Sequence, residues 1–352
     1  IALQIDVGWA SRATDIAVIV TDWLPIGGRG PKPGDPSLTH GGETPAGTCT
    51  TVGCPVNVAT GRYFDLRTDI FIPGTIPLEL RRAHAVDSFG PQGKGWASTW
   101  AQHLRMTAET VTFQDPDGCL ITFHTPRDEV LSHNLRHPHL ELLGRRSAEL
   151  FIYDRRVQQF LVFADEGGDI RRLSRIEDRN GNRISFLYGA DGLRRVEHSD
   201  GFALQVHSKA GLIRHAVLDA ADGESCTFSW DYTRSGQLCE VRSSQAGCLR
   251  YDHDERGRII AWRNDGATHV HYDYGADGLI WRIWSESGHA GVELDYDLER
   301  RRTVTRTADG AVKSWDWTED GVVWRETDAL GQVWLTEWDH HRAPELPSRA
   351  RP

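Results

Sequence analysis

The sequence predicts an all-β protein in which a strand-rich module precedes a spiral of β-hairpins. Glycine breaks recur from residue 178 onward in two interleaved sets, so that a unit of about 21 residues repeats roughly seven times. The segments between the breaks alternate apolar and polar residues, which is the period of a strand with one buried face. The 35 glycines and 13 tryptophans, with a single methionine, also suit short strands and tight turns better than long helices.

The chain divides into four predicted regions. Residues 1–52 are interpreted as an arm, a linker or a plug, because the stretch 24–55 is dominated by Pro, Gly, Ser and Thr. Such a composition cannot bury enough apolar surface to fold alone. Residues 53–150 form the predicted strand module, residues 151–342 hold the repeats, and residues 343–352 are a tail.

The plainest strand signal in the module is TVTFQDPDGCLITFH, residues 110–124. Val111 and Phe113 alternate with polar residues before the turn residues DPDG. Ile121 and Phe123 resume the alternation after the turn. The stretch therefore predicts a β-hairpin with these four apolar side chains in the core.

Each repeat is expected to form a hairpin of the same kind. HVHYDY (269–274) and VELDYDL (292–298) both alternate apolar and polar side chains. Tight hairpin turns need residues with positive φ, which Asp-Gly pairs supply at 200–201, 222–223, 265–266 and 309–310. One expected glycine is missing near Arg301. Because a single hairpin cannot bury its apolar face, we expect consecutive hairpins to join edge to edge into one curled antiparallel sheet.

The aromatic residues of the repeats have two interpretations. Aromatic neighbours across strands contribute roughly 0.2–1 kcal/mol per pair, so a ladder of rings from repeat to repeat accounts for the excess. Stacking on carbohydrate is the functional alternative. Trp281 and Trp284 are three residues apart, so one ring should face outward, towards cargo or a partner, unless a bulge intervenes. The ladder is expected to contain the tyrosines that precede a break: Tyr188, Tyr232, Tyr251, Tyr274 and Tyr296.

Charge and hydropathy exclude two classes of protein. A net charge of −10 argues against nucleic acid as the main partner, because binding to phosphates needs a basic face. The charges are mixed in sign along the chain, as on a solvated surface. No apolar run reaches the roughly 18 residues of a membrane span, and no signal peptide is visible.

The cysteines and histidines indicate no metal site. Six cysteines are scattered along the chain, and although Cys49 and Cys54 could pair or bind metal, no second such pair accompanies them. Reduced thiols and folding in the cytoplasm are the simpler interpretation. Four histidines lie in one segment without the periodicity that would make them converge on an ion, which favours a polar loop. They are His124, His133, His137 and His139.

No catalytic residue, cofactor-binding residue or metal ligand is predicted. The chain has no Gly-x-Ser-x-Gly elbow and no glycine-rich phosphate loop. Acidic side chains on the strands are expected on the alternating exposed face, where solvation is the default.

Several motifs resemble one known family. YDHDERGRI (251–259) resembles the YD repeat, in which Tyr-Asp is followed by a short spacer and Gly-Arg-Leu/Ile. YTRSGQL (232–238), YGADGLRRV (188–196) and YGADGLIWRI (274–283) keep its Tyr, Gly and apolar positions. The resemblance implies that these residues anchor the repeats: Tyr188, Gly192, Tyr232, Gly236, Tyr251, Asp252, Gly257, Arg258, Tyr274, Gly278 and Tyr296.

The upstream module points to the same family. GCPVNVATGRYFDLRTDIFIPGTIPLELRRAH (53–84) is similar to the module that precedes the repeats in bacterial Rhs proteins, with Cys54 in place of the usual Asp. GPQGKGWASTW (90–100) matches the Gly-Trp segment of that module. The resemblance covers about residues 53–342, which is most of the chain.

The resemblance implies a structural function. Rhs proteins are polymorphic toxins of interbacterial competition, whose YD repeats wind into a hollow β-shell, or cocoon, around a C-terminal toxin domain. Many are delivered by type VI secretion. The implied partners are the Rhs core and toxin domain, a PAAR or VgrG-type spike protein, a chaperone and an immunity protein. The implied location is the bacterial cytoplasm during synthesis, followed by secretion or delivery to a target cell. A carbohydrate- or surface-binding β-repeat module is the alternative.

The chain departs from the complete pattern of the family. It has too few repeats to close a large shell, no recognisable PAAR domain and no C-terminal toxin, and it starts at Ile1 rather than Met. We therefore expect the N-terminal part of an Rhs protein, or a truncated one, with no enzymatic activity in this chain. DPDGCL (115–120) is similar to the Asp-Pro-x-Gly-Leu cleavage motif of the family, but the alternating strands around it favour a hairpin turn.

Overall fold

The computed structural model describes residues 51–52, 56–126, 131–135, 137–219, 225–266, 268–286, 288, 291–319, 321–338 and 347–351. Every regular element in these ranges is a β-strand, so the predicted all-β fold is confirmed. The same ranges contain no helix with the length and apolar character of a membrane span. Cys49, Cys54 and nearly all of the predicted arm lie outside the described residues.

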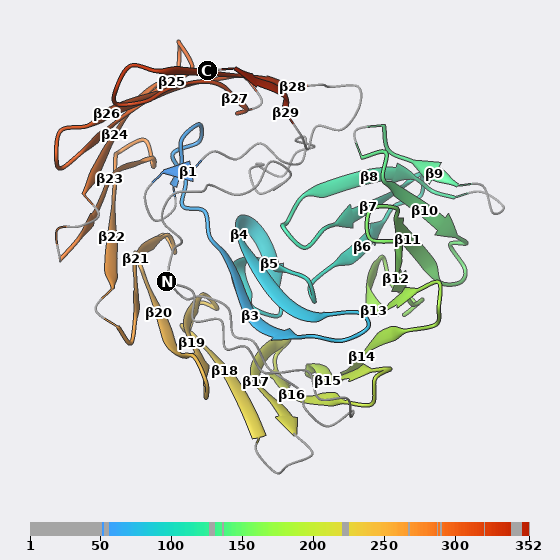
Figure 1. Ribbon diagram of the computed structural model, residues 1–352. Helices are drawn as coiled ribbons and strands as arrows, with labels where there is room; N and C mark the ends of the chain where they lie inside the picture. The colour runs from blue at the N-terminus through green and yellow to red at the C-terminus, as the bar shows by residue number, and fades with distance from the viewer. Residues whose placement is uncertain are drawn as a thin grey trace.

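A small inner sheet precedes the rest of the structure. The strands β3, β4 and β5 pair antiparallel in that order, and the short strands β1 and β2 form a separate pair. In Figure 1 the inner sheet lies inside the arc drawn by the later strands. The bounds are β1 Thr51–Val52, β2 Val56–Asn57, β3 Leu66–Ile72, β4 Leu78–Gly90 and β5 Gly93–Ser98.

Strands β6–β13 close into a barrel. The strand β13 is long enough to have two neighbours on one edge, because Ile170–Arg172 pairs with β6 while Arg175–Glu177 pairs with β14. The barrel therefore continues into the repeats through a shared strand. Its strands are β6 His103–Met106, β7 Thr110–Gln114, β8 Leu120–His124, β9 Ser132–His133, β10 Leu140–Gly144, β11 Leu150–Asp154, β12 Gln159–Phe163 and β13 Ile170–Asp178.

The remaining strands form one long antiparallel sheet in which each strand pairs with the next, as the repeats predict. We call β13–β29 the repeat sheet, and Figure 1 shows that it curls around the inner sheet. Its further strands are β14 Arg183–Gly189, β15 Gly192–His198, β16 Ala203–Lys209, β17 Leu212–Asp219, β18 Ser225–Tyr232, β19 Leu238–Ser243, β20 Gly247–His253, β21 Ile259–Asn264, β22 His269–Tyr274, β23 Ile280–Ser285, β24 Val292–Asp297, β25 Arg302–Thr307, β26 Val312–Trp317, β27 Val323–Thr327, β28 Val333–Trp338 and β29 Pro347–Arg351.

One turn design recurs along the sheet. At Asp254 the backbone N–H donates to the Arg258 carbonyl at 3.0 Å, and the Gly257 N–H donates back to the Asp254 carbonyl at 2.9 Å. Gly257 has a φ of 79°, which an L side chain tolerates poorly. The Asp254 carboxylate also accepts the Arg256 and Arg258 N–H groups, each at 2.9 Å. The same backbone pattern starts at Asp115, Asp178, His198, Thr233, Gly275, Thr307, Thr318 and Asp328.

The Asp-Gly prediction holds for two of its four turns. Gly201 and Gly310 have φ values of 95° and 85°. The prediction is wrong for Gly266, which does not have positive φ and instead allows a close approach, since a Cβ there would lie 3.2 Å from Asn264 Oδ1. The pair at 222–223 lies outside the described residues. Where the repeat lacks a glycine, Arg301 itself adopts a φ of 53°.

The core lies between the inner sheet and the concave face of the repeat sheet. Trp96 of β5 is buried with Trp230 of β18 and Trp262 of β21, and all three are at most 1% exposed. The predicted hairpin at 110–124 is confirmed by the β7–β8 pairing, and its four apolar side chains are buried in the part of the same hydrophobic cluster that extends into the barrel. Three of the 13 tryptophans therefore fill the space between the two layers.

A bulge decides the directions of Trp281 and Trp284. The register of β22 against β23 shifts between Asp273 and Tyr274, so that Trp281 has no partner opposite it. Trp281 is 43% exposed. Trp284 pairs with His271 and stacks on its ring, on the face opposite the buried Tyr272. Because the bulge breaks the alternation, both tryptophans lie on the outer side.

Candidate functional site

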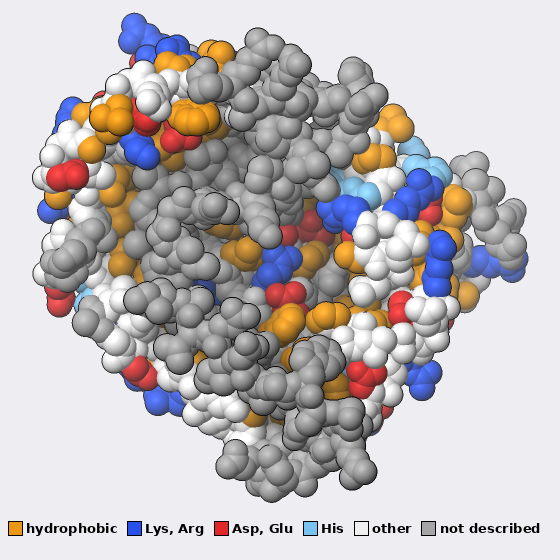
Figure 2. Space-filling view, in the orientation of Figure 1, with side chains coloured by type: hydrophobic (Ala, Val, Ile, Leu, Met, Phe, Trp, Pro, Cys, Tyr) orange, Lys and Arg blue, Asp and Glu red, His pale blue; other side chains and the backbone are white. Residues whose placement is uncertain are grey.

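The inner sheet meets the repeat sheet through charged side chains as well as apolar ones. Figure 2 shows apolar side chains around the inner rim, and basic beside acidic side chains near the middle of the ring. Asp65, Arg67, Asp69 and Arg82 come from β3, β4 and the residue before β3, and all are at most 7% exposed. We call these four residues, with Tyr251 of β20 and Trp230 of β18, the buried seam.

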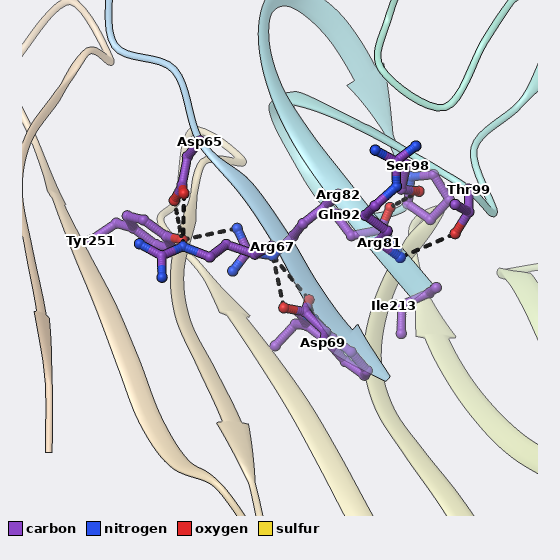
Figure 3. A network of polar contacts seen from close by, with 12 residues as sticks. Asp65, Arg67, Asp69, Arg81, Arg82, Gln92, Ser98, Thr99, Ile213 and Tyr251 are labelled. Carbon is purple, nitrogen blue, oxygen red and sulfur yellow. Dashed lines mark hydrogen bonds and ion pairs between the residues drawn. The ribbon is translucent and has the colours of Figure 1, made fainter. Parts of the chain in front are cut away.

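Arg82 links the two layers of the seam (Figure 3). Its Nε donates to both Asp69 carboxylate oxygens, at 3.0 and 2.9 Å. Its Nη1 donates to the Tyr251 hydroxyl at 2.9 Å. Asp69 Oδ2 also accepts the Trp230 indole N–H at 2.8 Å. One guanidinium and one carboxylate of the inner sheet therefore bind two repeats directly.

Asp65 forms the second half of the seam. Its Oδ2 accepts the Tyr251 hydroxyl at 3.0 Å and the Tyr63 hydroxyl at 2.8 Å, while its Oδ1 accepts Arg67 Nε at 2.7 Å. The two carboxylates thus balance the two guanidinium groups of Arg67 and Arg82. These hydrogen bonds offset part of the cost of burying the charges, although Arg82 Nη2 is buried without a hydrogen bond.

Aromatic rings surround the two guanidinium groups. The Arg82 guanidinium lies 4.3 Å from the centroid of the Trp96 ring, and the Arg67 guanidinium lies 5.1 Å from that of Trp262. Burial raises the pKa of the Tyr251 hydroxyl above its ordinary value, although Arg82 opposes the shift. Tyr251 therefore stays protonated and donates its hydrogen bond throughout the neutral range.

Four of the predicted anchor tyrosines share a different arrangement. Each hydroxyl donates to a backbone carbonyl of the preceding strand in the sheet, at 2.7–2.8 Å. The pairs are Tyr188 with Leu173, Tyr232 with Ile213, Tyr274 with Ile259, and Tyr296 with Ile280. We call this contact the repeat clamp. Since none of these rings contacts another ring of the set among the described residues, hydrogen bonds rather than ring pairs join the repeats.

An arginine covers the ring in three of the four clamps. The Arg258 guanidinium lies 4.1 Å from the centroid of the Tyr274 ring, and Ile259, next in sequence, accepts the hydroxyl. Arg172 covers Tyr188 at 4.1 Å and Arg214 covers Tyr232 at 4.7 Å. The Gly-Arg-Ile stretch at 257–259 thus supplies a turn glycine, a cation over the next tyrosine and the acceptor for its hydroxyl.

Tyr251 does not belong to the predicted ladder. It pairs with Trp262 in the interior of the strand, whereas Tyr232 and Tyr274 pair with the first residue of the next strand, beside a bulge. His253 occupies that clamp position in β20. Tyr251 is six residues before its turn glycine, whereas Tyr274 is four residues before its own. The distance to the turn glycine therefore distinguishes the seam tyrosine from a clamp tyrosine.

The other predicted glycine anchors have positive φ. The φ values of Gly192, Gly236 and Gly278 are 120°, 87° and 85°; Gly236 and Gly278 lie in turns between strands, and Gly192 is the first residue of β15. Asp252 lies on the outer face, where its carboxylate pairs with Arg263 Nη1 at 2.7 Å. Its contact is therefore with the neighbouring strand rather than with the turn.

The residues weighed for catalysis or metal binding do not gather at the seam. Asp115 lies in the β7–β8 turn, where its Oδ1 accepts the Asp117 and Cys119 N–H groups at 3.0 and 2.8 Å. His124 ends β8 and His133 ends β9, while His137 and His139 lie between β9 and β10 with ring centroids 5.9 Å apart. Within the described ranges, three metal-ligating side chains come together instead at His269, His271 and Glu286.

The sequence did not point to the charged residues of the seam. Acidic residues on strands were expected to face solvent, and that expectation is wrong for Asp69, which is 3% exposed. The inner sheet is covered by the repeat sheet, so its polar side chains find partners more than 150 residues away in sequence. A weak signal was present in DLRTD (65–69), where charged residues recur at alternate positions beside an apolar strand.

Comparison with known proteins gives matches over both parts of the chain. Residues 53–123 match a family model described as a domain of unknown function, DUF6531. The probable deoxyribonuclease RhsA of Dickeya dadantii (strain 3937) is 28% identical over 257 residues, which cover 70% of this chain and 18% of RhsA. RhsB of the same strain, also named a probable deoxyribonuclease, is 27% identical over 289 residues, covering 79% of this chain and 18% of RhsB.

Among solved structures, the crystal structure of TcdB2-TccC3 matches 80% of this chain and 16% of that chain, with a TM-score of 0.37 and 10% identity. The matches to RhsA and RhsB cover less than a fifth of the length of either protein. They therefore do not assign the deoxyribonuclease activity in those names to this chain. The YD motifs, the repeat sheet that they form and the two relatives agree: the chain is a distant homologue of RhsA and RhsB and resembles a segment of an Rhs/YD-repeat protein.

Proposed function

We propose that this chain is a shell segment that encloses and protects a toxin domain located C-terminal to it, and helps to deliver that domain in competition between bacteria. The observation that carries the proposal is the curled repeat sheet, braced on its concave side by the inner sheet. Strands from β14 to β28 each pair on both sides, so no strand edge is exposed along the wall. A wall without free edges resists aggregation around its cargo.

The inner sheet supports this function as a brace. The segments next to its strands also contact the repeats: the N–H of Thr75, between β3 and β4, donates to Asp200 at 2.9 Å, and the carbonyl of Gly61, before β3, accepts the Ile280 N–H at 2.8 Å. Between them lie the buried seam and the Lys94 N–H, which donates to the Gly236 carbonyl at 2.9 Å. Because these contacts are spread over several repeats, they hold the repeat sheet at one curvature. A single sheet without such contacts could bend to different degrees.

The enzymatic activity is assigned to the cargo and not to this chain. RhsA and RhsB are named probable deoxyribonucleases, which suggests a nuclease as one class of cargo. The proposed partners are the C-terminal core and toxin domain, a secretion spike protein of the PAAR or VgrG type, a chaperone and an immunity protein. We place synthesis in the bacterial cytoplasm and action after secretion, with the type VI route as the proposed path.

Protease protection in the full-length protein tests the proposal. We expect trypsin to spare the toxin domain in the intact protein and to digest it when Arg82→Met disrupts the seam. The matched control is Arg300→Met, because Arg300 is 83% exposed in its side chain. Equal digestion of the toxin domain in the intact protein and in isolation would refute enclosure.

Exposed tryptophans favour glycan binding as the alternative function. Trp281, Trp324 and Trp334 are each 42–43% exposed, although they belong to different strands or bulges. A glycan array probed with this chain distinguishes the two functions. A hit abolished by Trp281→Ala, with protease protection absent, would replace the shell proposal by the binding module.

A further inference from the structure

A histidine pair lies on the outer face of the repeat sheet, away from the seam and the clamps. Val270 and Tyr272 of β22 point into the core, at 1% and 3% exposed. Because side chains alternate along a strand, His269 and His271 share the opposite face. Their ring centroids are 4.0 Å apart, with an angle of 41° between the ring planes.

Glu286 completes a cluster of three potential ligands. It follows β23, and its Oε1 lies 3.3 Å from His269 Nδ1 and 3.7 Å from His271 Nε2. One donor atom from each residue lies within 4.8 Å of the other two. Donor atoms around a tetrahedral ion with bonds of about 2.1 Å are roughly 3.4 Å apart, so small side-chain movements suffice to bring all three onto one ion.

The two histidines are held in place but are not satisfied. The Trp284 ring stacks on His271 with centroids 4.0 Å apart and an angle of 11° between the planes. The Nε2 atoms of both histidines are shielded from solvent and form no hydrogen bond. Buried polar atoms are ordinarily paired, so His271 Nε2, which is unpaired and lies 3.7 Å from Glu286 Oε1, is a position for a ligand.

The surroundings allow an ion to enter. The Glu286 side chain is 67% exposed, so an ion can approach from its side of the cluster. Arg263 pairs with His269 across the strands, but its guanidinium is neutralised by Asp252 at 2.7 Å. This cationic side chain on β21 is therefore already engaged in an ion pair.

We propose that His269, His271 and Glu286 form a binding site for a divalent transition metal ion, with Zn²⁺ as the expected ion. Two imidazoles and one carboxylate suit Zn²⁺, and by the general order of affinities also Co²⁺, Ni²⁺ and Cu²⁺, whereas Mg²⁺ and Ca²⁺ prefer sites built from oxygen. Three protein ligands leave a fourth position for water. The bound ion would join β22 to the residue that follows β23, and so stabilise this hairpin from outside.

Metal titration of the full chain tests the site. Calorimetry with ZnCl2 should find one ion per chain that depends on these residues, and CoCl2 should give the visible absorption of a four-coordinate ion without a thiolate charge-transfer band. His271→Gln and Glu286→Gln should each weaken binding about tenfold or more. Zn²⁺ should also raise the Tm of the wild type but not that of the variants.

A second histidine pair supplies the matched control. His207 and His215 lie directly opposite each other on β16 and β17, and they are not part of any three-residue ligand group in the described ranges. The double variant His207→Gln/His215→Gln should bind Zn²⁺ like the wild type. The proposal is overturned if no ion binds, if His271→Gln and Glu286→Gln bind as tightly as the wild type, or if the control pair loses binding equally. Circular dichroism of the metal-free variants checks that they fold.

Discussion

Tyr274 and Tyr251 precede similar turns in similar sequence motifs, yet they do different things. Tyr274 closes a repeat clamp, in which its hydroxyl meets the backbone of Ile259 and its ring lies under Arg258. Tyr251 meets Arg82 and Asp65, which lie on the other layer of the protein. The clamp is a local contact that repeats can copy from one to the next. The buried seam occurs once, and its partners are charged.

This difference predicts unequal dependence on single side chains. A clamp hydroxyl bonds a neutral carbonyl, and losing it leaves one acceptor unpaired. The seam holds two carboxylates and two guanidinium groups out of water, so removing one partner leaves an uncompensated buried charge. Stability should therefore be concentrated in the seam and distributed over the clamps.

Arg82→Met should have the largest effect. The substitution leaves the Asp69 carboxylate buried without its ion pair, which costs roughly 3–5 kcal/mol of unfolding free energy. Urea unfolding followed by tryptophan fluorescence measures it. Arg300→Met, at an exposed ion pair, should change the free energy by less than about 1 kcal/mol. If the two variants unfold alike, the seam is not the stabilising element that its burial indicates.

Tyr251→Phe and Tyr274→Phe compare the two kinds of tyrosine directly. Hydrogen bonds to charged groups are worth about 1.5–3 kcal/mol and neutral ones about 0.5–1.5 kcal/mol, so Tyr251→Phe should cost about twice as much. Both changes remove one oxygen and keep the ring, which makes each the control for the other. A larger loss from Tyr274→Phe in the same urea titrations would reverse the proposed division between seam and clamp.

Sequence patterns predicted the repetitive part of this molecule and not the part that occurs once. The alternation and the turn glycines define β13–β28, because each strand there is specified by its own residues and its immediate neighbours. Even the missing glycine at Arg301 marks a real turn with positive φ. Trp281 remained undecided because one bulge redirects it, and a bulge depends on the register with the next strand.

The seam could not be predicted in the same way. Asp69 and Arg82 are on neighbouring strands, but what buries them is Trp230 and Tyr251, about 160 residues further along the chain. A period-two pattern shows that one face of a strand is apolar and the other polar. It does not show whether a second layer of the protein covers the polar face. The metal-ligating cluster was missed for a related reason, since Glu286 joins the two histidines only through the β22–β23 pairing.

Acid should weaken the seam before it weakens the clamps, through His84 of β4. The half-buried His84 ring packs edge-on against Tyr63 and Trp96, and burial lowers its pKa from 6.5 to about 4. Because the folded protein holds this imidazole neutral, its contribution to stability is fully present above pH 6.5 and is lost as the pH falls towards 4. Allowing for partial exposure, the loss at pH 4 should be about 2 kcal/mol.

Urea unfolding at pH 7, 5.5 and 4 measures this loss in the wild type and in His84→Gln, whose side chain does not titrate. The variant should be less stable at pH 7 but should lose about 2 kcal/mol less between pH 7 and pH 4 than the wild type. Equal slopes for the wild type and His84→Gln would show that another group carries the acid sensitivity. That outcome would separate His84 from the seam while leaving the contacts of Arg82 and Tyr251 in place.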